Sequence, residues 1–376
     1  MTFAFVTNSV PQSNDGLLRF NALTPNVVRE TPTVAAELSL FAPESAALAS
    51  APVGPFRAVH ALPKHADVAE FFAGNRFDLV VLDYDATAGG HRDRYAFLLL
   101  ARGLLRASDG VSVAVLASES NAFPGTVPFS VAAGRNRSLF EQLLVEAPLC
   151  FTFSEAIASR LREKRSGEVQ VVPAGSPVPC PKYTRLQAKA MLGFADRRDV
   201  LIGLLGRNGE FNSEWLTAAC SEAFRKAPAA RLLYLGPDGD LIRQQRRPIP
   251  LLDAGMPSPE DTSVRLSAMD FAIMPGAHRA EARPDHPALS ACLQHGVPVV
   301  ATTAQSTPDP LFGALPSNLA LVPSDNLGAF IETVEAFCRG VAEDPANRQT
   351  DSELTAYYQA RLSSQVALEA ITKSLR

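Results

Sequence analysis

Three polar residues that could carry chemistry follow the most apolar run in the first half of this 376-residue chain. Asp83, Asp85 and His91 come just after FDLVVL (77–82), a run that predicts a parallel strand buried on both faces. A carboxylate or an imidazole at the end of such a strand can act as a general base or hold a polar ligand. Polar residues also end many strands that have no catalytic role, so both interpretations stay open here.

A cation follows a second strongly apolar run. Arg207 comes directly after Gly206, at the end of VLIGLLG (200–206), and a guanidinium can pair with two oxygens of an anion. The alternative is a solvated loop arginine. The loop after the first predicted strand holds Asn14-Asp15-Gly16, where the glycine permits a close approach of the backbone to a ligand. The same triplet is also an ordinary turn.

Short apolar runs alternate with amphipathic helical patterns, which is typical of parallel α/β sheets. In the first half, Leu149–Phe153 is predicted as the last strand, and Arg137–Glu146 as a helix with Ser138 and Glu141 in a capping box. The other strands predicted there are Phe3–Thr7, Glu37–Phe41, Arg57–Leu62, Phe77–Leu82 and Ser112–Ala117, and the other helices are Arg94–Ala107 and Glu155–Lys164.

The alternation restarts after Pro173–Lys182, whose prolines favour neither a helix nor a central strand. The strands predicted beyond it are Val200–Leu205, Arg231–Leu235, Pro250–Leu252, Phe271–Met274, Val297–Ala301 and Ala320–Val322. The predicted helices are Glu214–Lys226, Asp240–Gln245, Thr262–Ala268, Ala288–His295, Leu327–Arg339 and Ser352–Leu375.

These elements predict an α/β chain with two doubly wound, Rossmann-like domains. Residues 1–172 form the first, 173–182 the linker, and 183–340 the second, while 341–376 are helices expected to cross back towards the first domain. Ligands of open parallel sheets bind beyond the carboxyl ends of the strands.

Composition argues against several other classes of protein. A net charge of −4 without a basic run gives no sign of a nucleic-acid partner. The five cysteines are far apart in sequence, which argues against a disulfide framework or a zinc site and fits a cytoplasmic protein. The start of the chain lacks the pattern of a signal peptide, and no apolar run has the length of a membrane span. No G-x-G-x-x-G follows an early strand, which argues against an NAD enzyme.

An ordered series of motifs carries a family resemblance. The motifs are FTFSEAIASRLRE (151–163), VQVVPAGSP (169–177), AKAMLGF (188–194), LIGLLGRN (201–208), LLYLGPDGD (232–240), RLSAMDFAIMPG (265–276) and ALSACLQHGVPVVAT (288–302). In this order they resemble the family 4 class of GT-B glycosyltransferases. The resemblance implies a GT-B fold, a nucleotide-sugar donor bound by the second domain, and an acceptor bound by the first.

The resemblance also implies roles for residues after the first strand of the second domain. Arg207, with Gly206 and Asn208 beside it, would pair with the donor diphosphate and stabilise charge on the leaving group. The family usually has a lysine five residues further on, where this chain has Asn212. The substitute cations that the sequence offers are Arg243, Arg246, Arg247 and Arg279. Free N–H groups at the start of the helix near Pro287 could bind phosphate oxygens as well.

The family's pair of glutamates is only partly represented. Glu281 corresponds to the glutamate near the transferred sugar, with Asp285 as a competing candidate. The second glutamate, which holds the donor ribose, falls at Ala291 or, with a one-residue slip, at Ser290. A serine hydroxyl can hydrogen-bond a ribose hydroxyl, although serine in a helix is more often structural.

Further expectations concern the donor base and metal ions. Gly236-Pro237-Asp238-Gly239 is expected to shape the wall around the nucleotide base, and is also a turn. Asp83-Tyr84-Asp85 matches the metal-binding Asp-x-Asp pattern, but we take it as a coincidence because donor sites of this class usually need no metal. Neither a metal nor another cofactor is therefore expected. Trp215 is expected in the core rather than against a base.

The leading prediction from the sequence is a retaining, hexosyltransferase-type glycosyltransferase. It would use a nucleotide diphosphate sugar, such as a UDP-sugar, and an acceptor that is a glycan, lipid, protein or small molecule. The missing lysine and glutamate favour one alternative, a catalytically degenerate chain that binds nucleotide sugar or acts as a partner subunit. A second alternative is a nucleotide-sugar epimerase, which can share the fold.

Overall fold

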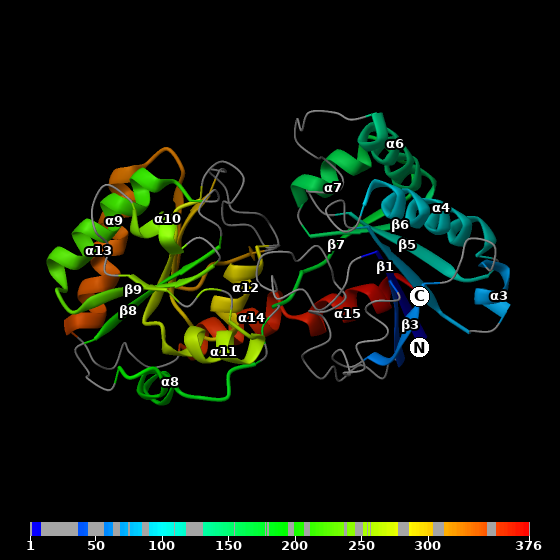
Figure 1. Ribbon diagram of the computed structural model, residues 1–376. Helices are drawn as coiled ribbons and strands as arrows, with labels where there is room; N and C mark the ends of the chain where they lie inside the picture. Colours follow the sequence, from blue (N-terminus) through cyan, green and yellow to red (C-terminus); the bar gives the residue numbers. More distant parts are fainter. Residues whose placement is uncertain are drawn as a thin grey trace. The chain divides into compact units, whose positions relative to one another are not determined.

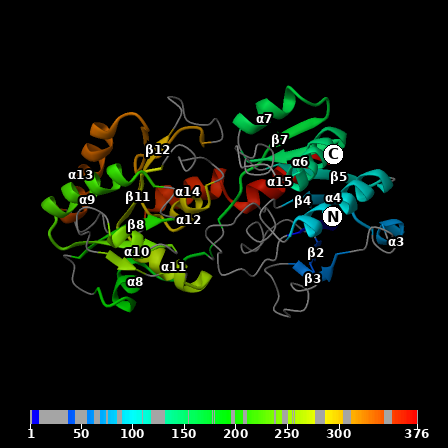
Figure 2. The same cartoon turned by 45° about the horizontal axis from the view of Figure 1, so that its top comes forward.

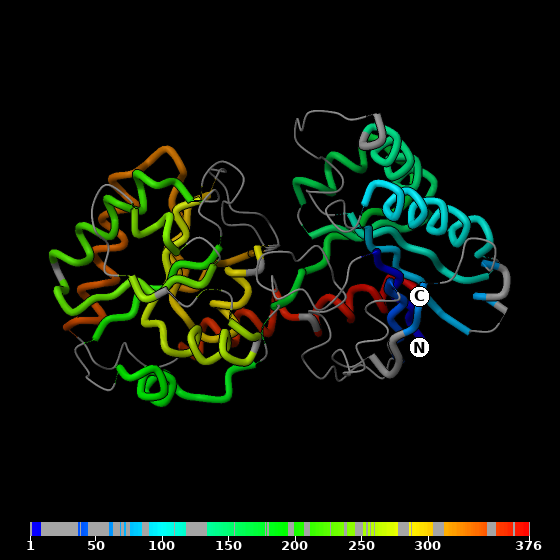
Figure 3. Tube along the Cα trace, viewed as in Figure 1, coloured from blue at the N-terminus to red at the C-terminus, as the bar shows by residue number. Residues whose placement is uncertain are grey.

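The computed structural model describes two compact units of the chain (Figure 1). Unit 1 contains the described residues up to Ala174 together with those from Ser364 onward, and unit 2 contains those from Gly175 to Ser363. The first and last described residues, Thr2 and Leu375, therefore both belong to unit 1 (Figure 3). The described residues are 2–8, 37–43, 56–62, 68–73, 76–84, 90–108, 110–117, 131–153, 155–176, 178, 180–194, 199–206, 211–236, 239–244, 251–253, 255, 257–276, 286–303, 312–343 and 351–375.

Unit 1 is built on a seven-stranded parallel sheet with the strand order β3-β2-β1-β4-β5-β6-β7. The strands are β1 (Thr2–Thr7), β2 (Glu37–Ala42), β3 (Phe56–Ala61), β4 (Leu79–Asp83), β5 (Ser112–Ala117), β6 (Leu149–Thr152) and β7 (Glu168–Val171). The chain builds outward from β1 to β3 and then returns to pair β4 with β1. The strand order therefore reverses between β1 and β4, and this is the topological switch point of unit 1.

Side chains of these strands alternate between two cores. Val80 and Leu82 of β4 pack on one face, and Leu79 and Val81 pack on the other, as the period of a strand requires. The helices on the first face are α3 (Val68–Ala73), α4 (His91–Ala107), α6 (Val131–Glu146) and α7 (Glu155–Arg162). The C-terminal helix α15 (Ser364–Ser374) packs into the opposite core through Ala367, Leu368 and Ile371.

Two sequence predictions for unit 1 are wrong. The last strand is β7 rather than Leu149–Phe153, and only one of the four residues of β7 is buried, so its apolar signal is weak. Helix α6 begins at Val131, which places Ser138 inside the helix and rules out the predicted capping box. Glu141 instead accepts a hydrogen bond from Arg137 Nε at 3.0 Å, one helical turn away.

Unit 2 is built on a six-stranded parallel sheet with the order β10-β9-β8-β11-β12-β13. The strands are β8 (Val200–Leu205), β9 (Ala230–Leu235), β10 (Leu251–Asp253), β11 (Phe271–Met274), β12 (Val299–Thr303) and β13 (Leu319–Pro323). Each coincides with or overlaps a predicted strand. The order reverses between β8 and β11, so unit 2 has its own switch point there.

Helices cover both faces of the second sheet. One face carries α9 (Ser213–Lys226), α10 (Gly239–Arg243) and α13 (Leu327–Glu343). The other face carries α11 (Pro259–Ala268), α12 (Pro287–Gln294) and α14 (Ser352–Arg361). Trp215 on α9 is buried beside Phe330, with the ring centroids 5.3 Å apart. The prediction that Trp215 belongs to the core is therefore confirmed.

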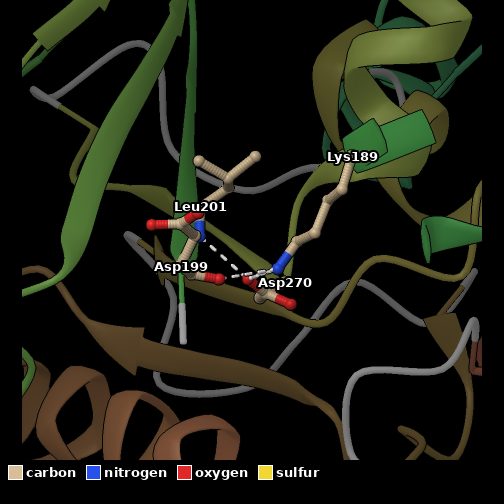
Figure 4. A network of polar contacts seen from close by, with 4 residues as sticks. All are labelled: Lys189, Asp199, Leu201 and Asp270. Atoms are coloured by element: carbon tan, nitrogen blue, oxygen red, sulfur yellow. Dashed lines mark hydrogen bonds and ion pairs between the residues drawn. The ribbon is translucent and has the colours of Figure 1, made fainter. Parts of the chain in front are cut away.

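A buried ion pair fixes α8 (Arg185–Met191) to the amino ends of β8 and β11 (Figure 4). Lys189 Nζ lies 2.6 Å from Asp270 Oδ2, and the two side chains are 3% and 0% exposed. The same carboxylate oxygen accepts the backbone N–H of Leu201 at 2.8 Å, while Lys189 also donates to the carbonyl of Asp199 at 2.8 Å. Because Asp270 precedes β11 and Leu201 lies in β8, this network joins one helix to two strands.

The predicted final helix, Ser352–Leu375, is wrong as a single element, because the chain forms α14 and α15 with a break at residues 362–363. Leu354, Tyr358 and Leu362 pack in the core of unit 2, whereas Ala367 and Leu368 pack in that of unit 1. At about 100° per residue, these two groups would point to different sides of one straight helix. The break lets each segment bury its own apolar side.

All five cysteines are free, with Cys180 exposed and the other four buried. Burial raises the pKa of the Cys150 thiol to about 11 and that of Cys220 to about 12, so both stay protonated near neutral pH. Among the described residues, no helix combines the length and the apolar character that a membrane span needs.

Candidate functional site

The carboxyl edge of the unit 2 sheet is organised around its switch point. The backbone N–H of Asn212 donates to the carbonyl of Pro275 at 2.7 Å, and Phe211 forms an isolated bridge with Gly276. The segment after β8 is thereby tied to the segment after β11. Ligands of open α/β sheets bind in the crevice at such a point, so this edge is the candidate site of unit 2.

Two glycines let the ends of β8 and β9 approach each other closely. Gly206 has a φ of 130°, a value that residues with a Cβ rarely adopt. Its carbonyl accepts the hydroxyl of Tyr234 at 2.7 Å, and its N–H donates to Leu235 O at 3.1 Å. A Cβ on Gly236 would lie only 2.1 Å from the Gly206 carbonyl oxygen and 2.2 Å from the Tyr234 hydroxyl. Glycine at both positions thus shapes the backbone from which residue 207 continues.

We expect Gly236→Ala to distort this edge and to weaken ligand binding there. The new methyl group would meet the backbone oxygen of Gly206, which can move only if the end of β8 moves too. We expect a loss of about 1–3 kcal/mol in the free energy of unfolding, typical of overpacking, measured by urea denaturation. Gly193→Ala offers no matched control, since its φ of 83° adds strain of its own. Gly328→Ala is a matched control, because a Cβ there would meet only the Asn326 side chain, at 3.8 Å. Equal losses of the free energy of unfolding in Gly236→Ala and Gly328→Ala would contradict the argument that residue 236 has no room for a Cβ.

Asn212, which stands where the family has a lysine, is the N-cap of α9. Its Oδ1 accepts the backbone N–H groups of Glu214 at 3.1 Å and Trp215 at 3.3 Å. This cap satisfies two of the N–H groups that a helix start leaves without a partner. The side-chain oxygen therefore has a structural task, and only the amide nitrogen is left to donate to a phosphate.

Helix α12 also begins at the carboxyl edge, since it follows β11. Its N-cap is His286, which makes no side-chain capping bond, and Pro287 occupies the first turn. The partial positive charge of such a helix start favours a bound anion. Ser290 lies one turn further in, with 1% of its surface exposed, and its N–H donates to the His286 carbonyl at 3.1 Å. Its hydroxyl is therefore set behind the helix start rather than on the surface of the edge.

Thr302 is a residue of this edge that the sequence reading missed. Its Oγ1 accepts the N–H of Gly276 at 2.8 Å and lies 3.4 Å from the Met274 carbonyl. The hydroxyl thus joins the end of β12 to the segment after β11. A buried threonine near the end of a predicted strand was the available signal, but such residues are common in β structure.

His295, at the end of α12, is buried and held as the neutral imidazole. Its Nδ1 lies 2.8 Å from the Ala291 carbonyl, so Nδ1 carries the proton, and Nε2 accepts the hydroxyl of Ser263 at 2.8 Å. Burial lowers the pKa of His295 to about 4, and the hydrogen bond to Ala291 opposes this shift only in part. His295 therefore has a structural role.

This histidine predicts a pH dependence of stability. In the unfolded chain His295 takes up a proton below about pH 6.5, whereas the folded chain resists until about pH 4. Over that window the unfolded state binds more protons, so stability falls as the pH falls, by about 3 kcal/mol in total. Urea denaturation at several pH values from 7 to 4 checks this. His295→Gln should lose this part of the dependence of stability on pH, whereas Ser263→Ala should retain it. An identical slope in His295→Gln would contradict it.

The carboxyl edge of unit 1 contains two of the predicted candidates in described positions. Asp83 ends β4 with 1% of its surface exposed, and its Oδ2 accepts the Thr7 hydroxyl at 3.1 Å. Tyr84 is buried against Phe140, with the ring centroids 4.9 Å apart. His91 is the first residue of α4 and is exposed. Asp83 and Tyr84 are therefore parts of the core edge, and His91 faces solvent.

The remaining predicted site residues lie outside the described residues, and their roles stay predictions. They are Asn14, Asp15, Gly16, Asp85, Arg207, Asn208, Asp238, Glu281 and Asp285. Of the predicted donor-binding set, the structure brings Gly206, Gly236 and Asn212 to one edge of unit 2.

Comparison with known proteins identifies structural relatives. No protein-family model and no curated protein matches the chain. A sucrose-phosphate synthase from Thermosynechococcus elongatus is similar in structure, with 14% identity, a TM-score of 0.61, and coverage of 99% of this chain and 98% of that one. A protein assigned as a UDP-N-acetylglucosamine 2-epimerase from Listeria monocytogenes has 11% identity, a TM-score of 0.57, and coverage of 100% and 95%. The pneumococcal O-GlcNAc transferase GtfA, solved with UDP and GlcNAc, has 14% identity, a TM-score of 0.51, and coverage of 83% and 59%.

These likenesses, together with the two parallel sheets, show that the chain has the two-domain, Rossmann-like GT-B fold. The fold class predicted from the sequence is confirmed. At 11% to 14% identity the structural likeness shows the fold alone. The resemblance to family 4 stays a prediction.

Proposed function

We propose that the chain is a glycosyltransferase that transfers a sugar from a nucleotide diphosphate sugar to an acceptor. The observation that carries this proposal is the carboxyl edge of unit 2, where Gly206 and Gly236 bring the ends of β8 and β9 close together beside the switch point of the sheet. The GT-B fold supports it, because the similar structures include a sucrose-phosphate synthase and an O-GlcNAc transferase solved with UDP.

In this proposal the donor diphosphate lies against the segment that starts at Gly206. Arg207 pairs with the phosphate oxygens and stabilises the charge that grows on them as the glycosidic bond breaks. The start of α12 adds a partial positive charge without any charged side chain, which offsets in part the lysine that Asn212 replaces. Asn208 and Asp238 border the nucleotide, and Asp285 contributes a hydrogen bond to it. No metal is required, since these groups neutralise the leaving group.

The reacting sugar would lie near Glu281, and the acceptor near the first domain. There the segment Asn14-Asp15-Gly16 would approach both substrates, while Asp85 or His91 would bind the acceptor or take its proton. The resemblance to family 4 makes retention of the anomeric configuration and a hexosyl donor the specific form of the proposal.

The test is the thermal stability of the purified chain against UDP-, GDP-, dTDP- and ADP-sugars without added metal. A ligand that binds only the folded state raises stability by RT ln(1 + [L]/Kd), about 2.7 kcal/mol at 100 times Kd. We expect one nucleotide class to raise the midpoint, with the effect reduced in Gly236→Ala. If no nucleotide sugar shifts a well-folded sample, the donor site is absent.

An epimerase is the second candidate, favoured by the similar structure assigned as a UDP-N-acetylglucosamine 2-epimerase. It would convert its UDP-sugar into the epimer with no acceptor present, whereas the transferase would release UDP only as an acceptor is glycosylated. Incubation with UDP-GlcNAc alone, followed by analysis of the sugar, separates the two. A degenerate chain would bind nucleotide sugar and do neither.

A further inference from the structure

A group of basic side chains lies near the starts of α4 and α6 in unit 1. Arg94 NH2 lies 3.3 Å from His91 Nδ1, and Arg94 Nε lies 3.4 Å from the Gly90 carbonyl oxygen. Arg135 of α6 donates to the Tyr95 hydroxyl at 2.6 Å and lies over the Tyr95 ring, 4.3 Å from its centroid. Arg92, the neighbour of His91, is exposed too. We call His91, Arg94 and Arg135 the basic cluster.

The basic cluster is held in place by contacts between the two helices. Asn136 Nδ2 donates to the His91 carbonyl at 3.2 Å, which ties the first turn of α4 to α6. The helices lie side by side over one face of the sheet (Figure 1, Figure 2). Because Tyr95 both stacks on Arg135 and accepts its hydrogen bond, that guanidinium is oriented before any ligand arrives. Preorganised donors lose less entropy on binding.

Arg135 differs in its partners from two other arginines of these helices. Arg137, two residues after Arg135, pairs with Glu141 at 3.0 Å, and Arg102 pairs with Glu146 at 2.9 Å. Arg135, by contrast, has only Tyr95 as its contact among the described residues. Asp93, the acidic residue in the first turn of α4, accepts the Gly90 N–H at 3.0 Å and so caps its own helix. The positive charge of Arg135 is therefore not neutralised by an ion pair in the described parts of unit 1.

The position of the basic cluster is that of a ligand site. Helix α6 ends at Glu146, just before β6 begins at Leu149, and α4 ends at Ala107, just before β5 begins at Ser112. Both helices thus end at the amino edge of the sheet and begin at its carboxyl edge. At that edge Arg94 and Arg135 join His91. The Arg94 guanidinium can only donate hydrogen bonds, so His91 Nδ1 is the acceptor of their contact. The proton of the ring is therefore on Nε2, and Nε2–H is a further donor. Three oriented donor groups, two of them guanidinium ions, match the oxygens of a phosphate dianion best.

We propose that the basic cluster binds the phosphate group of a phosphomonoester, and that the acceptor of the transferase is such a compound. Arg135 and Arg94 take the phosphate oxygens, and His91 Nε2–H donates to a third oxygen or to the neighbouring hydroxyl. The assignment of the compound as acceptor rests on the proposed function. The phosphate site itself does not, because it belongs to unit 1 alone.

The test is calorimetric titration of the full chain with glucose 6-phosphate, glycerol 3-phosphate and inorganic phosphate, with no nucleotide sugar present. Glucose and glucuronate serve as the neutral and the carboxylate comparison. We expect phosphate compounds to bind, and Arg135→Gln to raise their Kd about tenfold or more, as the loss of a charged hydrogen bond does. Arg137→Gln is the matched control, since it lies on the same helix with its own carboxylate partner, and its Kd should stay near that of the parent.

Four results would overturn the proposal. The first is no binding of any phosphate compound to the folded parent chain, and the second is equal loss of affinity in Arg135→Gln and Arg137→Gln. The third is binding that Arg207→Ala abolishes and Arg135→Gln leaves intact, which would place the phosphate in the donor site of unit 2 and support the proposed function. Binding of glucuronate as tight as that of glucose 6-phosphate would overturn the choice of phosphate. Phosphate binding that depends on Arg135, without any transfer of sugar, would support the phosphate site and contradict the proposed transferase function.

Discussion

Replacing Asp270 by asparagine is expected to lower the free energy of unfolding of unit 2 by about 3–5 kcal/mol, the cost of breaking a buried ion pair. Lys189 Nζ lies 2.6 Å from the Asp270 carboxylate with almost no exposure to water. The asparagine has nearly the same shape but no charge, so the buried ammonium would lose its counter-ion while keeping its bond to the Asp199 carbonyl. The change would also disturb the bond from Leu201 N–H at the start of β8.

This loss can be measured for unit 2 alone, because Trp215 is the single tryptophan of the chain and lies in the core of unit 2. Its fluorescence in urea follows the unfolding of that unit. Glu222→Gln is the matched control, since it breaks an exposed pair with Arg225 on α9 that should contribute less than about 1 kcal/mol. A similar small loss in Asp270→Asn would show that the buried pair does not hold α8 in solution.

A double substitution tests whether the contributions of Lys189 and Asp270 to stability depend on each other. Lys189→Met combined with Asp270→Leu removes both charges and leaves apolar side chains of similar volume. We expect it to be less destabilising than the sum of the two single changes, since no buried charge is left without its partner. Additive losses would mean that the two side chains act independently, which the 2.6 Å contact argues against.

Arg207→Ala is expected to lower kcat for sugar transfer by about 100- to 1,000-fold, as loss of one group that stabilises developing charge does. The proposal places this guanidinium on the donor diphosphate, where negative charge grows in the transition state. Because the proposal gives Arg207 a role on the donor and none in the core, the free energy of unfolding should change by less than about 0.5 kcal/mol.

The measurement is release of the nucleoside diphosphate with the donor that the thermal-shift test identifies. Arg225→Ala provides the comparison, because Arg225 belongs to the same unit but lies near the end of α9, which starts at the carboxyl edge of the sheet and so ends away from it. Turnover by Arg207→Ala equal to that of Arg225→Ala would remove Arg207 from the site while leaving the fold assignment as it is.

The sequence was sufficient to predict the two sheets, because their signals are local. Each central strand is a short apolar run, as in residues 77–82 and 200–205, and helical periodicity separates one run from the next. The carboxyl ends of parallel strands must lie on one edge, so the sequence also indicated which segments matter, Gly206 and Gly236 among them. The ordered motifs from residue 151 to 302 carried the GT-B prediction, which the structural likeness confirms.

Sequence reasoning failed where a local signal is weak or misleading. Strand β7 has a single buried residue, and Ser138 with Glu141 imitates a capping box inside α6. The periodicity of residues 352–375 is helical throughout, so nothing local shows that Leu362 belongs to one core and Ala367 to another. Asn212 could be read as a stand-in for lysine, while the cap that occupies its oxygen is visible only once α9 is known to begin at Ser213.

Only the tertiary structure shows the contacts between residues that are far apart in the chain. Lys189 and Asp270 are separated by 81 positions, and Arg135 and Tyr95 by 40. A lone lysine or arginine in a sequence has no visible partner, and its charge is as consistent with solvent as with a buried pair or a ligand. The topology of the parallel sheets brings these side chains together, because it sets which helices begin and end at the same edge. The residue types were therefore readable from the sequence, and their partners followed from the order of the strands.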